Sequence, residues 1–272
     1  TMINSVATTT QKLRIGSGVV MLNHYSAFKV AETFNMLEAL HPGRIDVGIG
    51  RAPGSDFMTS RALGGNREID YSQKAYDLIG YLNQNLDKNH PFFDVALTPT
   101  GLKAPQVYLL GSSEGSSQLA GVLGAGFVLA LFIGNHERAP EIIKEYKKAF
   151  VPSTSFAKPL AMIAVACIVA DSKEEAEYIA SSHLYWKLQA ATQYKREALK
   201  SPEELVDIIK NLSDVDEKYY EESKQAMVLG TAKECQEKLA KLAAFYDVDE
   251  ILIVNVTYHF KDRVKSYQLL AQ

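Results

Sequence analysis

An arginine bracketed by glycines follows an apolar segment near residue 50. Residues 44–56 read "RIDVGIGRAPGSD", a buried-strand pattern that ends in Gly-Arg-Ala-Pro-Gly. In parallel α/β proteins, ligands bind beyond the carboxyl ends of the strands. Arg51 at such an end is suited to a phosphate, because its guanidinium stays charged and donates paired hydrogen bonds. The alternative is that Arg51 pairs with a nearby carboxylate, such as Asp46 or Asp56.

Gly48 and Gly50 in this segment resemble the G-x-G of a dinucleotide-binding loop. That fingerprint requires a helix to begin directly after the glycines. Here Pro53 and Gly54 continue a loop, so the sequence argues against a Rossmann site.

A second polar segment follows the apolar run "QVYLLG" at residues 106–111. It reads "SSEGSS" over residues 112–117 and leads directly into a helical pattern. Serine hydroxyls and free backbone N–H groups at a helix N-terminus form an anion site. The alternative is that one serine is an ordinary N-cap. Because this loop and Arg51 follow neighbouring strands of one sheet, the two segments together predict a phosphate site.

Six apolar strands alternate with helices along the 272 residues. This pattern predicts a parallel sheet in an α/β fold. An open doubly wound sheet needs no more than six βα units, whereas a closed (β/α)8 barrel needs eight. The chain is expected to form one domain over residues 1–272, with a polar helical insertion at about residues 201–226. The strands are expected at residues 13–22, 44–50, 106–111, 127–132, 160–170 and 250–256, and the first long helices at 27–40 and 71–86.

The composition argues against several classes of protein. The net charge is −3 with no basic run, so neither a nucleic-acid surface nor an anionic membrane surface is expected. No apolar run reaches the ~18–20 residues of a membrane-spanning helix, and we expect a cytoplasmic protein.

Cys167 lies in an apolar run, which predicts a buried structural thiol. The histidines have no metal-ligand spacing, so no metal is assigned. His183, Tyr185 and Trp186 share a helix and are expected in the core or at an interface.

Four segments of the chain resemble the bacterial luciferase-like family of flavin-dependent monooxygenases, and they extend from near the first residue to the last. They are "KLRIGSGVVML", "KVAETFNMLEALHPGRIDVGIGRAPGSD", "VYLLGSSEGSSQLAGVLG" and "VLGTAKECQEKLAKLAAFYDVDEILIVNVTYHFKDRVKSYQLLA". The resemblance implies a (β/α)8 TIM barrel that binds FMN at its carboxyl rim. It also implies that the first two βα units, about 60 residues, are absent from this sequence, which begins with the helix before the third strand.

The resemblance assigns cofactor-binding residues by position. Arg51 matches the arginine that binds the FMN phosphate, and Ser113 and Ser116 match the phosphate-binding hydroxyls. Ser17 and Gly18 match a strand bulge that lies against the flavin ring, where the family commonly has a non-prolyl cis peptide. The full predicted cofactor set is Ser17, Gly18, Gly50, Arg51, Ser112, Ser113, Gly115 and Ser116.

Two further residues are candidates for catalysis. His24 lies in "LNHYSAF", where close relatives have prolines that this sequence lacks, so a solvated loop histidine is the alternative. Asp56 could hydrogen-bond near the flavin or cap the following turn.

The function implied is that of a monooxygenase that acts on paired donors with incorporation of molecular oxygen. Reduced FMN, supplied by a separate flavin reductase, would react with O2 at the flavin C4a position to oxidise a small organic substrate. A homodimer is expected. The alternatives are an F420-dependent oxidoreductase of the same fold and a non-catalytic relative that serves as a flavin-binding protein or partner subunit.

Overall fold

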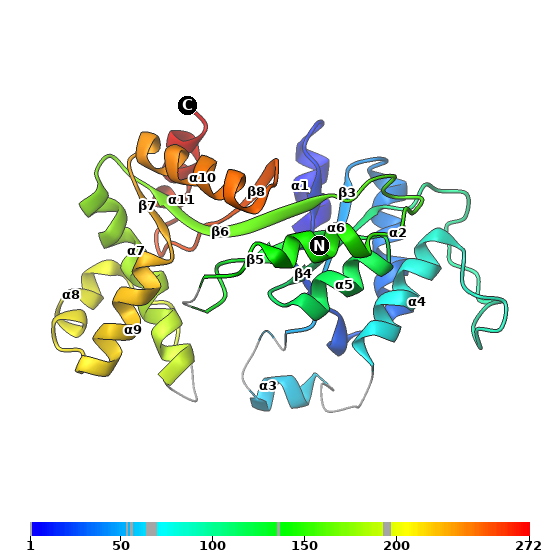
Figure 1. Ribbon diagram of the computed structural model, residues 1–272, viewed down its shortest axis with the longest axis horizontal. Helices are drawn as coiled ribbons and strands as arrows, with labels where there is room; N and C mark the ends of the chain where they lie inside the picture. Colours follow the sequence, from blue (N-terminus) through cyan, green and yellow to red (C-terminus); the bar gives the residue numbers. More distant parts are fainter. Residues whose placement is uncertain (1, 53, 55–56, 64–69, 135–136, 193–196) are drawn as a thin grey trace. The chain divides into compact units, whose positions relative to one another are not determined.

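The computed structural model describes residues 2–52, 54, 57–63, 70–134, 137–192 and 197–272. They form two compact units, which Figure 1 shows as ribbons. The first comprises Thr1–Leu129 and Glu141–Ala161, and the second comprises Ala130–Pro140 and Met162–Gln272. In both units the strands pair in parallel and alternate with helices, as the apolar pattern predicts.

The strands of the first unit form a parallel sheet in which β3 is paired on both edges. They are β1 (Ile15–Gly16), β2 (Val20–Met21), β3 (Ile45–Gly50), β4 (Gln106–Gly111) and β5 (Gly126–Ala130). Both β1 and β2 pair with the same edge of β3, whose other edge pairs with β4, and β4 pairs in turn with β5. The single strand expected at residues 13–22 is therefore wrong in detail, since Ser17, Gly18 and Val19 interrupt it.

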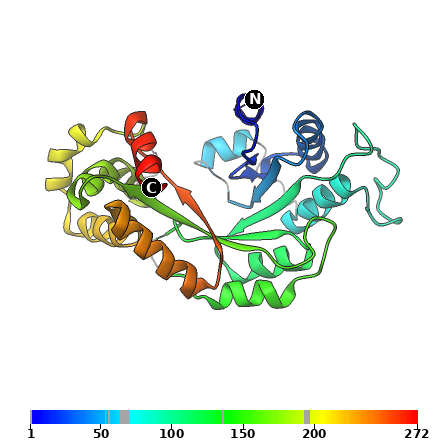
Figure 2. The same cartoon turned by 90° about the horizontal axis from the view of Figure 1, so that it is seen from above.

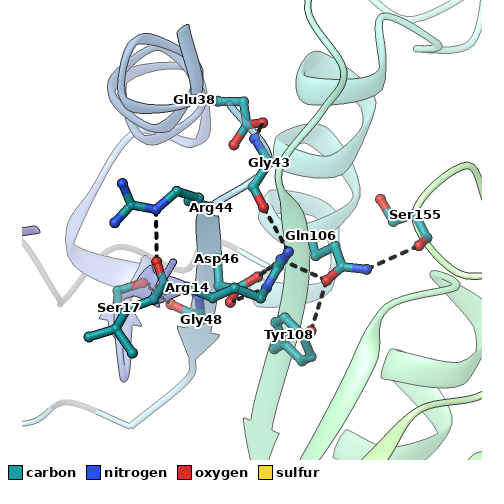
Figure 3. A network of polar contacts seen from close by, with 11 residues as sticks. Arg14, Ser17, Glu38, Gly43, Arg44, Asp46, Gly48, Gln106, Tyr108 and Ser155 are labelled. Atoms are coloured by element: carbon teal, nitrogen blue, oxygen red, sulfur yellow. Dashed lines mark hydrogen bonds and ion pairs between the residues drawn. The ribbon is translucent and has the colours of Figure 1, made fainter. Parts of the chain in front are cut away.

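This interruption explains the glycines of β3. Ser17 Oγ donates to Gly48 O at 2.8 Å and accepts from Gly48 N at 3.0 Å, so a side chain replaces the missing strand pairing (Figure 3). A Cβ on Gly48 would lie 2.1 Å from the Ser17 carbonyl oxygen, and one on Gly50 would lie 2.8 Å from a methyl group of Val19. The peptide bond between Gly18 and Val19 is cis, at the place where the family resemblance predicts one.

Six α-helices lie in the described residues of the first unit. They are α1 (Met2–Thr9), α2 (Ala27–Leu40), α3 (Phe57–Ala62), α4 (Tyr71–Asn83), α5 (Glu114–Val122) and α6 (Glu141–Ala149). α2 contacts α4, whereas α5 packs on β4 and on α6. Figure 2 shows α5 and α6 side by side in green. The predicted helix at 27–40 is confirmed, with Ser26 as its N-cap, and the one predicted at 71–86 ends three residues earlier, at Asn83.

A network of polar side chains joins the amino ends of these strands. The Arg14 guanidinium binds both carboxylate oxygens of Asp46, and it donates to Gln106 Oε1 at 2.7 Å and to Gly43 O at 2.9 Å (Figure 3). Tyr108 OH donates to the same Gln106 oxygen at 3.1 Å. One arginine thus ties the segment before β1 to the starts of β3 and β4.

The second unit is built around β6 (Ala161–Val169), whose nine residues are all buried. Residues 162–166 of β6 pair in parallel with β8 (Glu250–Val254), and residues 167–169 pair with β7 (Val228–Gly230). β7 was not predicted, because three residues are too few to show an apolar strand pattern. Cys167 is a buried free thiol, as predicted, and Cys235 is buried as well.

The described residues of the second unit also form five α-helices. They are α7 (Lys173–Thr192), α8 (Pro202–Lys210), α9 (Asp214–Gln225), α10 (Ala232–Tyr246) and α11 (Phe260–Leu270). Figure 1 shows α8 and α9 lying with α7, and both contact it. Ser201 and Thr231 cap α8 and α10 through reciprocal bonds with Glu204 and Glu234.

The contact between β3 and the interrupted strand predicts a large cost for a methyl group at residue 48. Gly48→Ala is expected to lower the free energy of unfolding by about 3 kcal/mol, because the Cβ would overlap a backbone oxygen. Urea denaturation measures this change. Gly115→Ala is the matched control, because its Cβ would meet nothing within 4 Å. The control is expected to be unchanged or more stable by up to about 1 kcal/mol. Equal effects of both substitutions would contradict the explanation.

Candidate functional site

The strand register brings the predicted phosphate residues to one edge of the first unit. Gly50, the last residue of β3, lies opposite Leu110 of β4. Arg51 therefore leaves β3 where β4 ends at Gly111 and the serine loop begins. Because the two strands are parallel and hydrogen-bonded, both segments lie at their carboxyl ends, as the sequence predicts.

Arg51 does not form the ion pair with Asp46 that was the alternative to phosphate binding. The Asp46 carboxylate binds Arg14 instead. Asp46 lies near the amino end of β3, so about 16 Å of extended strand separates it from Arg51. Asp56 lies outside the residues that the structure describes. Arg51 itself is exposed.

Ser113 is the N-cap of α5, so the plain capping interpretation of the serine loop holds. Ser113 Oγ accepts from Ser116 N at 3.4 Å, and Ser116 Oγ accepts from Ser113 N at 3.2 Å, which forms a capping box. Ser116 Oγ also donates to Ser113 O at 2.7 Å. The Ser116 hydroxyl proton is used in this bond, so Ser113 is the donor in the 3.3 Å contact between the two hydroxyl oxygens. The Ser113 side chain is nevertheless exposed at the helix terminus.

The donors at this edge fit a phosphate. The first N–H groups of an α-helix have no partner within the helix, and they carry a partial positive charge. At α5 these are the N–H groups of Glu114 and Gly115, and a Cβ on Gly115 would meet nothing within 4 Å, so a ligand can approach the backbone closely. Arg51 supplies the formal positive charge. Nothing in the described donor set conflicts with the phosphate of FMN.

His24 lies at a cavity that Val19, Val20 and Met21 of the interrupted strand also line. It ends the short 3-10 helix η1 (Leu22–His24) and is half-buried. The cavity has a volume of about 450 Å³, and Val19, Met21, Val30 and Phe34 are among its lining residues. Its walls are mainly apolar, which suits an organic molecule better than a charged group.

Two polar residues that the sequence analysis did not predict as site residues fix the position of η1. Asn23 Nδ2 donates to Arg51 O at 3.3 Å. Lys74, in the first turn of α4, donates to the carbonyl oxygens of Leu22, Asn23 and Tyr25 at 3.3, 3.0 and 2.8 Å. The Lys74 ammonium therefore fixes the turn that carries Asn23 and His24. No local pattern identifies Lys74, because its partners lie about 50 residues earlier in the chain.

Tyr71 precedes Lys74 by one turn and is buried beside Arg51. Its hydroxyl has no hydrogen-bond partner within the described ranges of the chain. Burial raises the pKa of the Tyr71 phenol, and the positive charge of Arg51 acts in the opposite direction. Tyr71 is therefore a neutral hydroxyl within electrostatic range of Arg51.

The second unit contains a buried histidine on α7, with a half-buried lysine one turn later. His183 is 6% exposed, and its Nδ1 makes no hydrogen bond to any residue for which coordinates are described. Burial and, as a smaller cause, the positive charge of Lys187 together lower the pKa of His183 from 6.5 to about 4. The prediction that His183 lies in the core is confirmed.

Parallel strands with hydrogen-bond donors gathered at their carboxyl ends are typical of α/β proteins that bind phosphate-bearing ligands. The sequence model of the family described as luciferase-like monooxygenase matches residues 1–247. The chain belongs to this family. No helix in the described part of the chain is long and apolar enough to cross a membrane.

Two relatives from Bacillus subtilis (strain 168) span the whole chain. The uncharacterised protein YwcH is 39% identical over 275 residues, which cover 100% of this chain and 81% of YwcH. An N-acetyl-S-alkylcysteine monooxygenase is 31% identical over 276 residues, which cover 99% of this chain and 80% of that enzyme.

The solved structures confirm the fold class. Apo-MsnO8 is 30% identical with a TM-score of 0.84 and covers 99% of this chain and 79% of its own. The FMN complex of the oxygenating constituent of 3,6-diketocamphane monooxygenase from Pseudomonas putida is 15% identical, with a TM-score of 0.63, and covers 99% and 80%. An F420-dependent secondary alcohol dehydrogenase is 13% identical, with a TM-score of 0.62, and covers 98% and 81%. This chain therefore has the parallel α/β fold of the luciferase-like TIM barrels.

Removal of the Lys74 ammonium is expected to loosen η1. In Lys74→Met, the amide protons of residues 23–25 should exchange faster, and stability should fall by about 1–2 kcal/mol, because three backbone carbonyls lose a charged donor. Hydrogen exchange followed by mass spectrometry measures the first effect. Lys29→Met is the control, since Lys29 pairs only with Glu32 on the surface of α2 in the described contacts. Unchanged exchange at η1 in Lys74→Met would refute this role.

The buried His183 predicts a pH dependence of stability. Its folded pKa of about 4 lies below 6.5, so the unfolded chain takes up a proton that the folded chain refuses as the pH falls between these values. The free energy of unfolding should therefore drop by about 2 kcal/mol between pH 7 and pH 5 on account of this residue. His183→Gln should lose that part of the drop. Urea denaturation of both proteins at the two pH values tests it, and parallel pH profiles would show the prediction to be wrong.

Proposed function

We propose that the protein is an FMN-dependent monooxygenase that uses reduced FMN and O2 to oxidise a small organic substrate. The observation that carries the proposal is the register of β3 and β4. It supports a single phosphate site made of Arg51, the α5 N-terminus and the Ser113 hydroxyl. Bound FMN would supply the electrons that activate O2.

The chain's own residues would bind and orient this cofactor. Arg51 would neutralise the phosphate, and the N–H groups of Glu114 and Gly115 would donate to its oxygens. Gly50 and Ser112 adjoin these groups at the strand ends. Ser17 and Gly18 would lie against the flavin ring, because the interrupted strand bears no large side chain at these two positions. His24 is the candidate for a substrate-side residue, because it lines the largely apolar cavity.

The proposal also names a flavin reductase and a second copy of the chain as partners, and a class of substrate to test first. A separate flavin reductase would deliver reduced FMN, and the protein would form a homodimer. One relative is named for N-acetyl-S-alkylcysteine, so S-alkyl compounds are the first candidates for the organic substrate.

Arg51→Ala is expected to weaken FMN binding by about 2–4 kcal/mol, because the phosphate loses its formal counter-charge. This corresponds to a dissociation constant roughly 30- to 1,000-fold higher. Titration of flavin fluorescence measures it. Lys148→Ala is the control, because it removes the same charge from an exposed site on α6. An affinity unchanged in Arg51→Ala would show that the arginine has only a structural role.

The same titration separates the alternatives. Micromolar binding of F420 without binding of FMN would replace the proposal with an F420-dependent oxidoreductase. Failure to bind either cofactor would favour a non-catalytic relative. With FMN bound, substrate-dependent O2 consumption in the presence of a flavin reductase and NADH would support the monooxygenase.

A further inference from the structure

The second unit contains two buried thiols, one on β6 and one on α10. Cys167 lies in β6, and Cys235 lies in the first turn of α10. Cys235 Sγ is 4.0 Å from the carbonyl oxygen of Ile168, the residue that follows Cys167. Both side chains are fully buried, and both are free thiols. Since the two residues belong to one unit, their contact does not depend on how the units are placed.

The alternation of side chains along β6 directs Cys167 toward α10. Val165 of β6 and Lys238 of α10 line the same cavity. Because side chains two residues apart on a strand share one face, Cys167 points to the helix that Val165 faces. Cys235 precedes Lys238 by three residues, so the two lie on one face of α10. The two sulfur atoms are therefore neighbours in the interior of the second unit.

The surroundings of Cys235 favour its thiolate. The interaction with the Cys167 thiol lowers the pKa of Cys235, although burial opposes this, and the Lys238 ammonium acts in the lowering direction. The same interaction and burial raise the pKa of Cys167. A cysteine in the first turn of a helix and near a lysine is a good nucleophile, because the helix dipole and the ammonium stabilise its thiolate. Of the two thiols, Cys235 is therefore the one suited to react first.

A cavity of the second unit gives a small polar oxidant a route toward this pair. Its volume is about 380 Å³, and Glu137, Arg138 and Gln225 are among its polar lining residues, so it is large and polar enough for water. Lys238 lines the cavity and is within electrostatic range of both thiols. Hydrogen peroxide resembles water in size and polarity, so it would enter the same space. A small opening of the first turn of α10 would then bring it to the sulfur of Cys235.

We propose that Cys167 and Cys235 form a peroxide-sensitive pair that closes to a disulfide between β6 and α10. The Cys235 thiolate would attack hydrogen peroxide, which breaks the O–O bond, leaves a sulfenic acid on Cys235 and releases hydroxide. The Cys167 sulfur would then displace the sulfenic oxygen as water and form the S–S bond. The hydroxide regains the proton that Cys235 gave up, so two thiols are oxidised while one peroxide is reduced to two waters. The inference goes beyond the proposed function and does not rest on it.

The test treats the folded protein with millimolar hydrogen peroxide. The oxidant is removed with catalase, and free thiols are blocked with iodoacetamide while the protein is unfolded. Non-reducing peptide mapping should find the peptides of Cys167 and Cys235 joined, and dithiothreitol should separate them. Thiols that remain free after this treatment would overturn the proposal. A linked pair that forms only when peroxide is added to urea-unfolded protein would overturn it as well.

Single substitutions assign the roles of the two cysteines. In Cys167→Ala, the sulfenic acid on Cys235 has no partner, so dimedone should trap it. In Cys235→Ala, dimedone should label nothing over the same time. Trapping on Cys167 instead of Cys235 would overturn the assigned order of reaction. If an alanine variant fails to fold, the peptide map of the unmodified protein still decides whether the pair closes.

A matched pair of lysine variants tests the ammonium. Lys238→Met should slow disulfide formation several-fold, because the Cys235 thiolate loses a nearby positive charge. Lys241→Met is the control, since it removes an exposed ammonium of the same helix and should leave the rate unchanged. Equal rates in the two folded variants would show that Lys238 does not activate the pair and would overturn that part of the mechanism.

Discussion

The close contact between the interrupted first strand and β3 is the constraint on which the first unit depends. Ser17, Gly18 and Val19 leave the regular pairing path, and Ser17 Oγ bonds to both backbone groups of Gly48. This approach is possible only because β3 has no Cβ where the interrupted strand touches it. The glycine spacing that resembles a nucleotide-binding loop is therefore a packing requirement. The same packing also affects the candidate phosphate site, because it fixes the position of β3 and therefore of Arg51, which follows this strand.

The arginines at the two ends of the first unit's sheet differ in how far the protein itself uses their hydrogen-bond donors. At the amino ends, Arg14 uses four of its five N–H donors on protein groups, namely Asp46, Gln106 and Gly43. At the carboxyl ends, Arg51 is exposed and follows β3 where the serine loop that leads into α5 follows β4. An arginine whose donors are mostly used by the fold stabilises it, whereas an exposed arginine near a helix N-terminus is available to a ligand. Sequence alone cannot separate these two arginines, because the acceptors of Arg14 come from segments up to 92 residues away.

The elements and residues that could be predicted are those with local signals. The helix Ala27–Leu40 and the strand Gln106–Gly111 appear within their predicted bounds, because apolar patterns and capping residues mark them in the sequence. Ser113 is recognisable for the same reason. The interruption at Ser17, the short β7 and the partners of Lys74 were missed because each is determined by tertiary contacts. The side chain of His183 illustrates the limit, since the pattern predicts its burial but not that its Nδ1 lacks a hydrogen-bond partner among the described residues.

The proposed phosphate site and the histidine of α7 differ in what water can do for their polar groups. The phosphate site is exposed and built from helix-terminal N–H groups, so it costs little when empty, because water satisfies its donors. An exposed site of this kind would accept any phosphate-bearing cofactor, so Arg51 alone does not discriminate FMN from F420. His183 is buried, and water does not reach its Nδ1, so the imidazole stays neutral and its burial is a cost that the packing of α7 must offset. The exposed donors are therefore available to a ligand, whereas the buried imidazole makes the stability of the fold depend on pH.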